Sequence, residues 1–111
     1  MEIKERRRFP RYDCSLKVDY STLGIAALES RSVVKNISEG GIRVPISRII
    51  RRGDVLSLRI YHKNDEPPIP AAGRVKWMDD NRDSRLIIDA GTEFTDIKSF
   101  DADALLATVK G

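Results

Sequence analysis

A chain of 111 residues is long enough to bury one hydrophobic core, and its 41% hydrophobic and 33% charged residues are typical of one globular domain. No apolar run approaches the roughly 20 residues of a membrane-spanning helix, and the first residues lack the apolar stretch of a signal peptide. The single cysteine, Cys14, excludes an internal disulfide. Together these features predict a cytoplasmic protein without a membrane span.

The net charge of +3 is confined to the start of the chain. Residues 1–11 carry five basic and two acidic side chains, whereas the remaining 100 residues carry fifteen of each. A protein that grips nucleic acid through phosphates needs a basic face spread over its surface. The pattern therefore favours a small anionic ligand over a nucleic acid. It also predicts a flexible basic arm over residues 1–11, followed by one domain over residues 12–111.

Six short segments follow the arm, each alternating apolar and polar residues or rich in β-branched ones, as half-buried strands are. Turn-forming Gly, Pro, Asn and Asp separate them, and a proline-bearing loop occupies residues 64–70. This spacing indicates a mainly β fold, either an antiparallel sandwich or a small barrel. The expected strands lie at about residues 15–20, 31–37, 42–45, 56–60, 74–78 and 86–94.

The hydrophobic period changes near the C-terminus. Apolar residues recur there at i, i+3, i+4 and i+7, which predicts a helix over about residues 99–110 that docks on the sheet. Ser99 is the expected N-cap, and Asp101 and Lys110 match the two ends of the helix dipole. The apolar stripe consists of Ala102, Leu105, Leu106 and Val109.

The sequence contains few groups arranged for catalysis. The one histidine, His62, and the one cysteine, Cys14, have no neighbour at the spacing of a nucleophile and its base or of metal ligands. We therefore interpret them as a surface imidazole and a half-buried thiol. The prediction is a protein that is not an enzyme and has no metal site.

The stretch VKNISEGGIRV carries groups that suit a ligand. Asn36 and Ser38 offer an amide and a hydroxyl that both donate and accept hydrogen bonds. Gly40 and Gly41 permit positive φ and let a ligand approach the backbone. The structural alternative is a tight glycine turn that joins two strands.

Two motifs in fixed order strengthen this interpretation. RRFPR places Arg7 and Arg11 in an RxxxR pattern, and NISEGG follows as an [DN]xSxxG pattern. The pair resembles the signature of the PilZ domain, a bacterial receptor module for the second messenger cyclic di-GMP. The likeness continues through GDVLSLRI, GRVKW and GTEF. It implies a six-stranded antiparallel split β-barrel with a C-terminal helix and a ligand on its outer surface.

The resemblance also implies roles for single residues. Arginines suit phosphates and the guanine edge because the guanidinium makes forked hydrogen bonds and stacks on bases. An arginine before the RxxxR motif, here Arg6, goes with a stacked pair of ligands. Trp77 is either a guanine contact or a core residue that alternates with Val75, and Arg43 either contacts the ligand or faces solvent. The predicted ligand-binding residues are Arg6, Arg7, Arg8, Arg11, Asn36, Ser38, Gly40, Gly41, Arg43 and Trp77.

One position departs from the commoner pattern, because Asn36 stands where aspartate is usual and its amide carries no charge. The expected mechanism is a transition from disorder to order. Clustered arginines repel each other until phosphates neutralise them, so ligand binding would fold residues 5–11 onto the barrel. An unidentified partner protein would then recognise the altered surface, in a pathway such as motility or biofilm formation.

Two other functions stay open at this point. A PilZ-like barrel could serve as a protein-interaction adaptor that binds no nucleotide, although such members usually lack the arginines that this chain keeps. A small β-barrel could instead bind single-stranded nucleic acid through its basic arm and surface aromatics. Only seven aromatic residues are scattered over the chain, which disfavours this second alternative.

Overall fold

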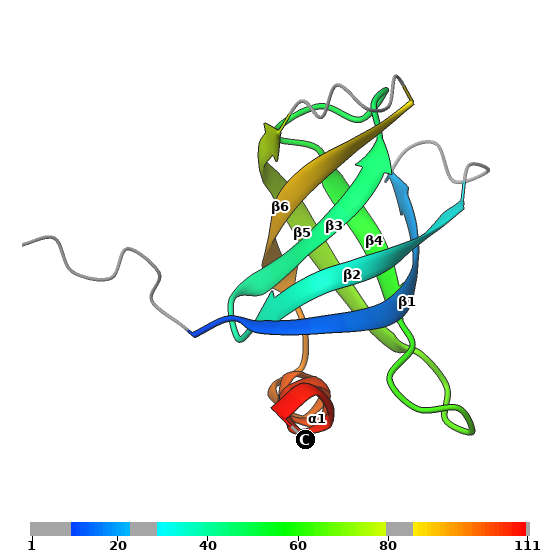
Figure 1. The fold of residues 1–111 in the computed structure, drawn as a ribbon, viewed down its shortest axis with the longest axis vertical. Coiled ribbons are helices and arrows are strands. Elements are labelled where there is room, and N and C mark those ends of the chain that lie inside the picture. Colours follow the sequence, from blue (N-terminus) through cyan, green and yellow to red (C-terminus); the bar gives the residue numbers. More distant parts are fainter. Residues whose placement is uncertain (1–9, 23–28, 80–85, 111) are drawn as a thin grey trace, which may run out of the picture.

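The computed structural model describes residues 10–22, 29–79 and 86–110. Arg6, Arg7 and Arg8 lie outside these ranges, and the predicted arm over residues 1–11 stays a prediction. Within the described ranges the chain forms six strands and one helix (Figure 1). The elements are β1 (Tyr12–Thr22), β2 (Ser30–Ser38), β3 (Gly41–Ser47), β4 (Val55–Ile60), β5 (Ile69–Asp79), β6 (Ile87–Asp96) and α1 (Ser99–Lys110).

The six strands form a closed barrel in the order β1-β2-β3-β6-β5-β4. Every neighbouring pair is antiparallel, and β1 closes the barrel by pairing with β4, where Val18 lies opposite Ile60. Closure leaves no edge strand exposed, so the backbone hydrogen bonds of the sheet are satisfied within the barrel. The predicted six-stranded antiparallel barrel with a C-terminal helix is confirmed.

Alternate residues of the strands point inward and form one apolar core. In β4, Leu56, Leu58 and Ile60 are buried while Ser57 and Arg59 between them are exposed, which is the expected period of two. Burial of each large aliphatic side chain stabilises the fold by roughly 1.5–3 kcal/mol. The largest fully buried side chains are Ile37, Ile42, Ile46, Leu56, Leu58, Ile60, Leu105, Val18, Val34, Val44 and Val75.

Helix α1 lies at one end of the barrel, and the β3–β4 connection lies at the other (Figure 1). Leu105 is fully buried in the barrel core, and the Lys110 ammonium lies 5.5 Å from the ring centroid of Tyr12 at the start of β1. The predicted N-cap is wrong by one residue. The carbonyl of Lys98 accepts the first helical hydrogen bond, from the Ala102 N–H at 2.9 Å, so Lys98 holds the position expected for Ser99.

The start of β5 also differs from the prediction. Ile69 and Pro70, expected in a loop, belong to the strand and pair with Ile60 and Arg59 of β4. The apolar Ile69 is buried in the core, and this packing outweighs the turn preference of the prolines around it.

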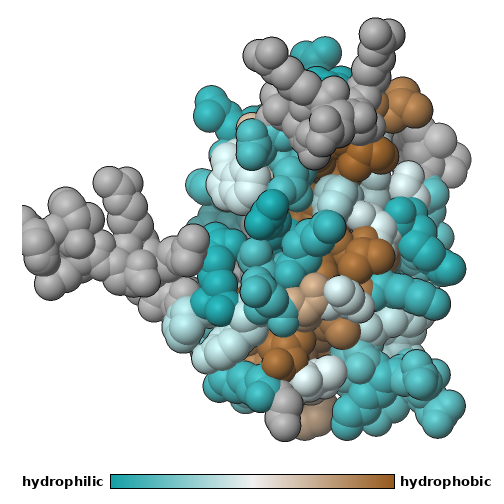
Figure 2. Space-filling model, in the orientation of Figure 1, coloured by the Kyte–Doolittle hydropathy of each residue, from teal (hydrophilic) through white to brown (hydrophobic). Residues whose placement is uncertain are grey.

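The barrel surface is mainly polar. Figure 2 shows one face on which apolar patches are separated by hydrophilic residues. Ile49, Leu86 and Phe100 are the most exposed large apolar side chains in the described ranges. In the same ranges, no helix has the length and apolar character needed to cross a membrane.

Candidate ligand site on the outer barrel surface

A row of four residues crosses four adjacent strands on the outside of the barrel. Asn36 of β2 lies opposite Arg43 of β3, Arg43 lies opposite Gly91 of β6, and Gly91 lies opposite Trp77 of β5. Directly opposite residues of antiparallel strands share one face, so the three side chains of this row are neighbours. The register thus brings together residues that are up to 55 positions apart in sequence.

Trp77 reaches the outer face because β5 contains a bulge. Val75 pairs with Thr92 and Trp77 with Gly91, so two steps along β5 correspond to one step along β6, and Lys76 is the extra residue. Val75 therefore points into the core and is 1% exposed, whereas Trp77 points outward and is 38% exposed. The alternative in which Trp77 is a core residue alternating with Val75 is wrong.

The absence of a side chain at Gly91 makes room for the Trp77 indole. A Cβ atom at Gly91 would overlap Nε1 and Cε2 of the indole, so the ring lies directly over the glycine backbone. A flat aromatic ring that is half exposed on a sheet is a suitable platform for a nucleobase. Gly91 is thus part of the site, although sequence reasoning did not select it.

Arg43 and Asp89 form an ion pair beside this platform. The Arg43 guanidinium donates from Nε to Oδ2 of Asp89 at 2.7 Å, and Nη2 lies 2.6 Å from the same oxygen. Asp89 lies two residues before Gly91 in β6, so Arg43 reaches it diagonally past the glycine that it faces. The hydrogen bond and the negative charge of Asp89 raise the pKa of Arg43 above its ordinary value.

The two sequence motifs meet at the opposite side of the row. Nη1 of Arg11, the second arginine of RxxxR, donates a hydrogen bond of 3.0 Å to Oδ1 of Asn36, the first residue of NxSxxG. Asn36 is 8% exposed and Arg11 is exposed, so the arginine lies over the amide. This contact spans 25 residues of sequence and joins the start of β1 to β2.

These residues line one hollow of about 470 Å³, which we call the outer hollow. Two arginines and two aspartates face it, so the charges of its described walls balance. The walls combine cations, carboxylates, an amide and an indole, which are groups that bind phosphate, purine edges and purine faces. The lining residues are Arg11, Asn36, Arg43, Trp77, Asp79 and Asp89.

The β2–β3 turn adjoins this row but uses its glycines differently from the prediction. The hydroxyl of Ser38 accepts a 3.1 Å hydrogen bond from the N–H of Gly40, which shapes the turn. Neither Gly40 nor Gly41 has positive φ, a feature confined to Gly53 among the described glycines. A Cβ at Gly41 would instead overlap the carbonyl oxygen of Thr92, so Gly41 permits the close approach of β3 and β6.

A family model for the PilZ domain matches residues 5–110 of this chain. The chain belongs to the PilZ domain family. Among curated proteins, no significant match to this PilZ domain is found.

Solved structures share the fold of this PilZ domain. The Bacillus subtilis inhibitor of motility, MotI/DgrA, is 25% identical with a TM-score of 0.76, and the match covers 96% of this chain and 51% of that one. The PilZ domain of YcgR from Escherichia coli, solved with c-di-GMP, is 11% identical with a TM-score of 0.72 over 96% and 90% of the two chains. MrkH of K. pneumonia, solved as a c-di-GMP complex, is 14% identical with a TM-score of 0.66 over 95% and 50%.

The chain spans about half the length of MotI/DgrA and of MrkH. At 11% and 14% identity, the likenesses to YcgR and MrkH show a common fold. The residues of this PilZ domain therefore have to be assigned from its own geometry.

The structure brings four of the ten predicted residues into the outer hollow: Arg11, Asn36, Arg43 and Trp77. Ser38, Gly40 and Gly41 form the adjoining turn, and Arg6, Arg7 and Arg8 lie outside the described residues. Sequence reasoning missed Asp79, Asp89 and Gly91. The GTEF motif contained Gly91 and was a usable signal, whereas Asp79 and Asp89 belong to none of the motifs.

Cys14 and His62 lie away from the outer hollow. Burial raises the pKa of the Cys14 thiol above its ordinary value, and its Sγ lies 3.6 Å from the Val34 carbonyl oxygen, which agrees with a half-buried thiol. The prediction of a surface imidazole is wrong, because the His62 side chain is only 6% exposed and lies 3.5 Å from Glu66. Over the ranges that the structure describes, no cluster of His, Cys, Asp and Glu is suited to a metal ion.

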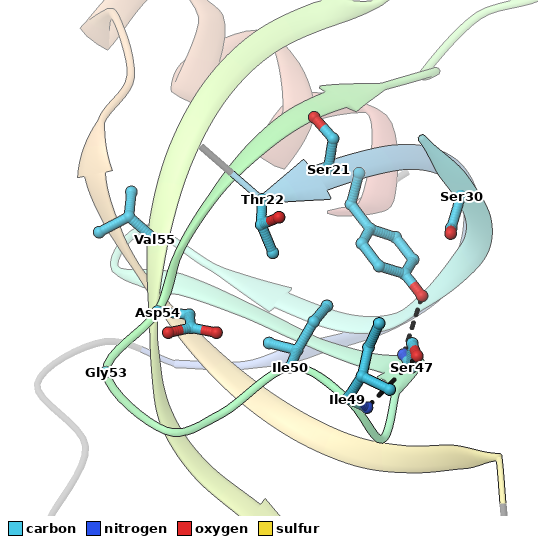
Figure 3. A pocket seen from close by; sticks show the side chains of 10 residues that line it. Ser21, Thr22, Ser30, Ser47, Ile49, Ile50, Gly53, Asp54 and Val55 are labelled. Atoms are coloured by element: carbon cyan, nitrogen blue, oxygen red, sulfur yellow. Dashed lines mark hydrogen bonds between the residues drawn. The ribbon is translucent and has the colours of Figure 1, made fainter. Parts of the chain in front are cut away.

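A larger hollow of about 630 Å³ lies at the end of the barrel away from α1 (Figure 3). Ile49 and Ile50 of the β3–β4 connection line it, and the Tyr20 hydroxyl accepts a 2.9 Å hydrogen bond from the Ser47 N–H. None of its described lining residues is a predicted ligand contact. Its size alone therefore does not make it the ligand site.

A buried carboxylate organises another part of the outer surface. Asp19 of β1 is 6% exposed and accepts hydrogen bonds from Arg31 at 2.8 Å and from the Tyr61 hydroxyl at 2.8 Å. Arg59 lies 3.8 Å away and also pairs with Glu29. The hydrogen bond from Arg31 is the main reason that the pKa of Asp19 lies below its ordinary value. Burial opposes this shift, whereas the Tyr61 hydrogen bond and the charges of Arg31 and Arg59 add to it. This cluster links β1, β2 and β4 and is a structural element of the barrel.

Proposed function

We propose that this PilZ domain is a receptor for cyclic di-GMP, which binds in the outer hollow. The observation that carries the proposal is the hydrogen bond between Arg11 and Asn36. It places one arginine of the RxxxR motif and the first residue of the NxSxxG motif in a single hollow that an indole also lines. PilZ domains solved with c-di-GMP share this fold, which supports the choice of ligand.

The walls of the hollow match the two chemical parts of this ligand. Cyclic di-GMP combines two phosphodiester charges with two guanines, so it needs cations and flat or hydrogen-bonding surfaces. Trp77 offers an exposed ring on which a guanine stacks, and the Arg11 guanidinium offers a fork for a phosphate or for the guanine edge. Ser38 shapes the turn beside Asn36 by accepting a hydrogen bond from the Gly40 N–H.

The balanced charge of the described walls favours a role for the arm in neutralising the phosphates of the ligand. Because Arg11 and Arg43 are offset by Asp79 and Asp89, the walls alone supply no net positive charge to a dianion. Arg6, Arg7 and Arg8 carry the surplus of the chain. We propose that they neutralise the phosphates and that binding brings the rest of residues 5–11 onto the barrel beside Arg11, which already contacts Asn36.

This rearrangement is the proposed output of the receptor. An arm that closes over the hollow changes the surface around β1, β2 and β3, and a downstream protein would recognise that surface. The protein would act as a receptor without catalysis, in the cytoplasm, where a free thiol such as Cys14 stays reduced.

Isothermal titration calorimetry with cyclic di-GMP at neutral pH tests the proposal. We expect binding at micromolar protein and ligand, and Arg7→Ala, Arg11→Ala and Asn36→Ala should each weaken it at least roughly tenfold. Lys17→Ala, which removes an exposed cation of β1 that does not line the outer hollow, is the control and should bind like the wild type. Absence of binding by the wild type would contradict the ligand assignment and favour an adaptor that binds no nucleotide.

A further inference from the structure

The two carboxylate oxygens of Asp89 have different surroundings among the described residues. Arg43 engages Oδ2 through both Nε and Nη2. Oδ1 is buried, and among the described residues it has no hydrogen-bond partner. An ionised carboxylate is an acceptor only, and a buried acceptor without a donor is rare in folded proteins because it loses water without compensation. The free oxygen is therefore an unoccupied acceptor on the wall of the outer hollow.

The position of Asp89 is related to the presence of Asn36 in the NxSxxG motif. Asn36 stands where an aspartate is commoner, and its Oδ1 already accepts a hydrogen bond from Arg11. The amide therefore brings no negative charge to the hollow. Asp89 brings that charge two strands away on the same outer face, since Asn36 lies opposite Arg43 and Arg43 holds Asp89.

We propose that Asp89 recognises a guanine of the bound ligand, with Oδ1 accepting a hydrogen bond from the N1–H or the N2 amine. The inference rests on the proposed function and names a specificity-determining residue of that site. Guanine presents two donors on this edge, whereas adenine presents a ring nitrogen with a lone pair at N1. An acceptor-only group therefore attracts guanine and repels the N1 position of adenine.

Trp77 and Arg43 complete the recognition. The Trp77 indole lies over Gly91, two residues from Asp89 on the same face, so a guanine stacked on the ring has its edge near the carboxylate. Because Oδ1 is buried, the atoms that cover it must shift to admit that edge. Arg43 acts as a positioning residue, because it holds Oδ2 and leaves Oδ1 for the ligand.

The test is calorimetry of the wild type, Asp89→Ala and Asp89→Asn with cyclic di-GMP and with cyclic di-AMP. The matched control is Asp79→Ala. Asp79 lies opposite Asp89 in the register of β5 and β6, and its carboxylate also lines the hollow. We expect Asp89→Ala to lose roughly ten- to a hundredfold in cyclic di-GMP affinity. Its cyclic di-AMP affinity should stay within about threefold or rise, and Asp79→Ala should keep the preference for guanine.

The remaining outcomes overturn the inference. Equal losses in Asp89→Ala and Asp79→Ala would show that the two carboxylates only maintain the shape of the hollow, because loss of negative charge by itself should strengthen binding of a dianion. A gain in affinity would show that Asp89 only withholds Arg43 from the phosphates. Asp89→Asn keeps the shape of the side chain and serves if the alanine variant does not fold, and it should lose guanine preference in the same direction. If the wild type binds cyclic di-GMP and both Asp89 variants bind it equally well, only the proposed role of Asp89 is refuted. If the wild type does not bind cyclic di-GMP, the proposed function itself is refuted.

Discussion

Arg11 and Asn36, 25 residues apart in sequence, are joined by a 3.0 Å hydrogen bond from the Arg11 guanidinium to the side-chain oxygen of Asn36. This bond connects the chain just before β1 with the outer face of β2. The arginine is exposed and the amide is buried, so the guanidinium is the solvent-facing member of the pair.

Arg11→Lys separates charge from shape in this pair. Lysine keeps the positive charge but lacks the planar fork, so we expect about a tenfold loss of cyclic di-GMP affinity. The free energy of unfolding should change by less than about 1 kcal/mol, because an exposed donor contributes little to stability. Calorimetry and urea denaturation measure the two effects. Full retention of affinity would show that charge alone suffices at this position.

Gly91→Ala should displace the indole of Trp77. A Cβ at Gly91 would overlap the ring, so we expect a loss of roughly 1–3 kcal/mol in unfolding free energy. Trp77 is the single tryptophan, so its fluorescence reports the displacement directly. Gly41→Ala is the contrasting variant, because its Cβ meets the Thr92 backbone and should destabilise the barrel while leaving the emission of the folded protein unchanged. An unshifted emission spectrum in Gly91→Ala would refute the stacked arrangement.

Asp19 should make the stability of the barrel depend on pH in the acid range. Its folded pKa lies below the ordinary value of 3.8, chiefly because of the hydrogen bond from Arg31. The contribution is therefore present in full above the unfolded pKa and is lost as the pH falls through the folded pKa. We expect the stability difference between wild type and Asp19→Asn to be constant from pH 7 to about 5 and to shrink below about 4.

Urea denaturation at each pH measures this difference. Asp65→Asn provides the control, because Asp65 is exposed in the β4–β5 connection and should leave the stability difference close to zero throughout. If the curves of wild type and Asp19→Asn run parallel down to pH 2.5, the ionised form of Asp19 is not what stabilises the cluster.

Arg6 should determine how many ligands bind. Under the resemblance to the family, an arginine before the RxxxR motif goes with a stacked pair of cyclic di-GMP molecules, so we expect two ligands per chain in the wild type and one in Arg6→Ala. The stoichiometry of a calorimetric titration gives the answer, with Arg8→Ala as the control for the loss of one positive charge. A single ligand in the wild type would contradict the proposed role of Arg6.

Much of the fold was predictable from local patterns. The period of two in β4 and the period of helix α1 identified both elements, because each buries one face against a single core. The N-cap was displaced by one residue and β5 began earlier than expected, since these details depend on packing around Lys98 and Ile69 that no local pattern records.

The site was predictable only where a motif spans it. Arg11 and Asn36 belong to the two motifs, and the structure joins them. Asp89 could not be found in this way, because its partner Arg43 reaches it diagonally across a strand pair, and only the register reveals that contact. The burial of the His62 side chain was missed as well.

The extra residue at Lys76 gives strand β5 two different phases. Before Lys76, the residues in the same alternation as Val75 face the barrel interior. After it, the residues in the same alternation as Trp77 face the outer hollow, so Val75 and Trp77 face opposite sides. With regular pairing, Lys76 would lie opposite Gly91 and Trp77 would face the interior together with Val75, so the bulge itself places the platform on the outer surface. The register of β5 against β6 is therefore as much a determinant of this surface as the identity of any residue in it, and substitution scanning by itself would not detect that dependence.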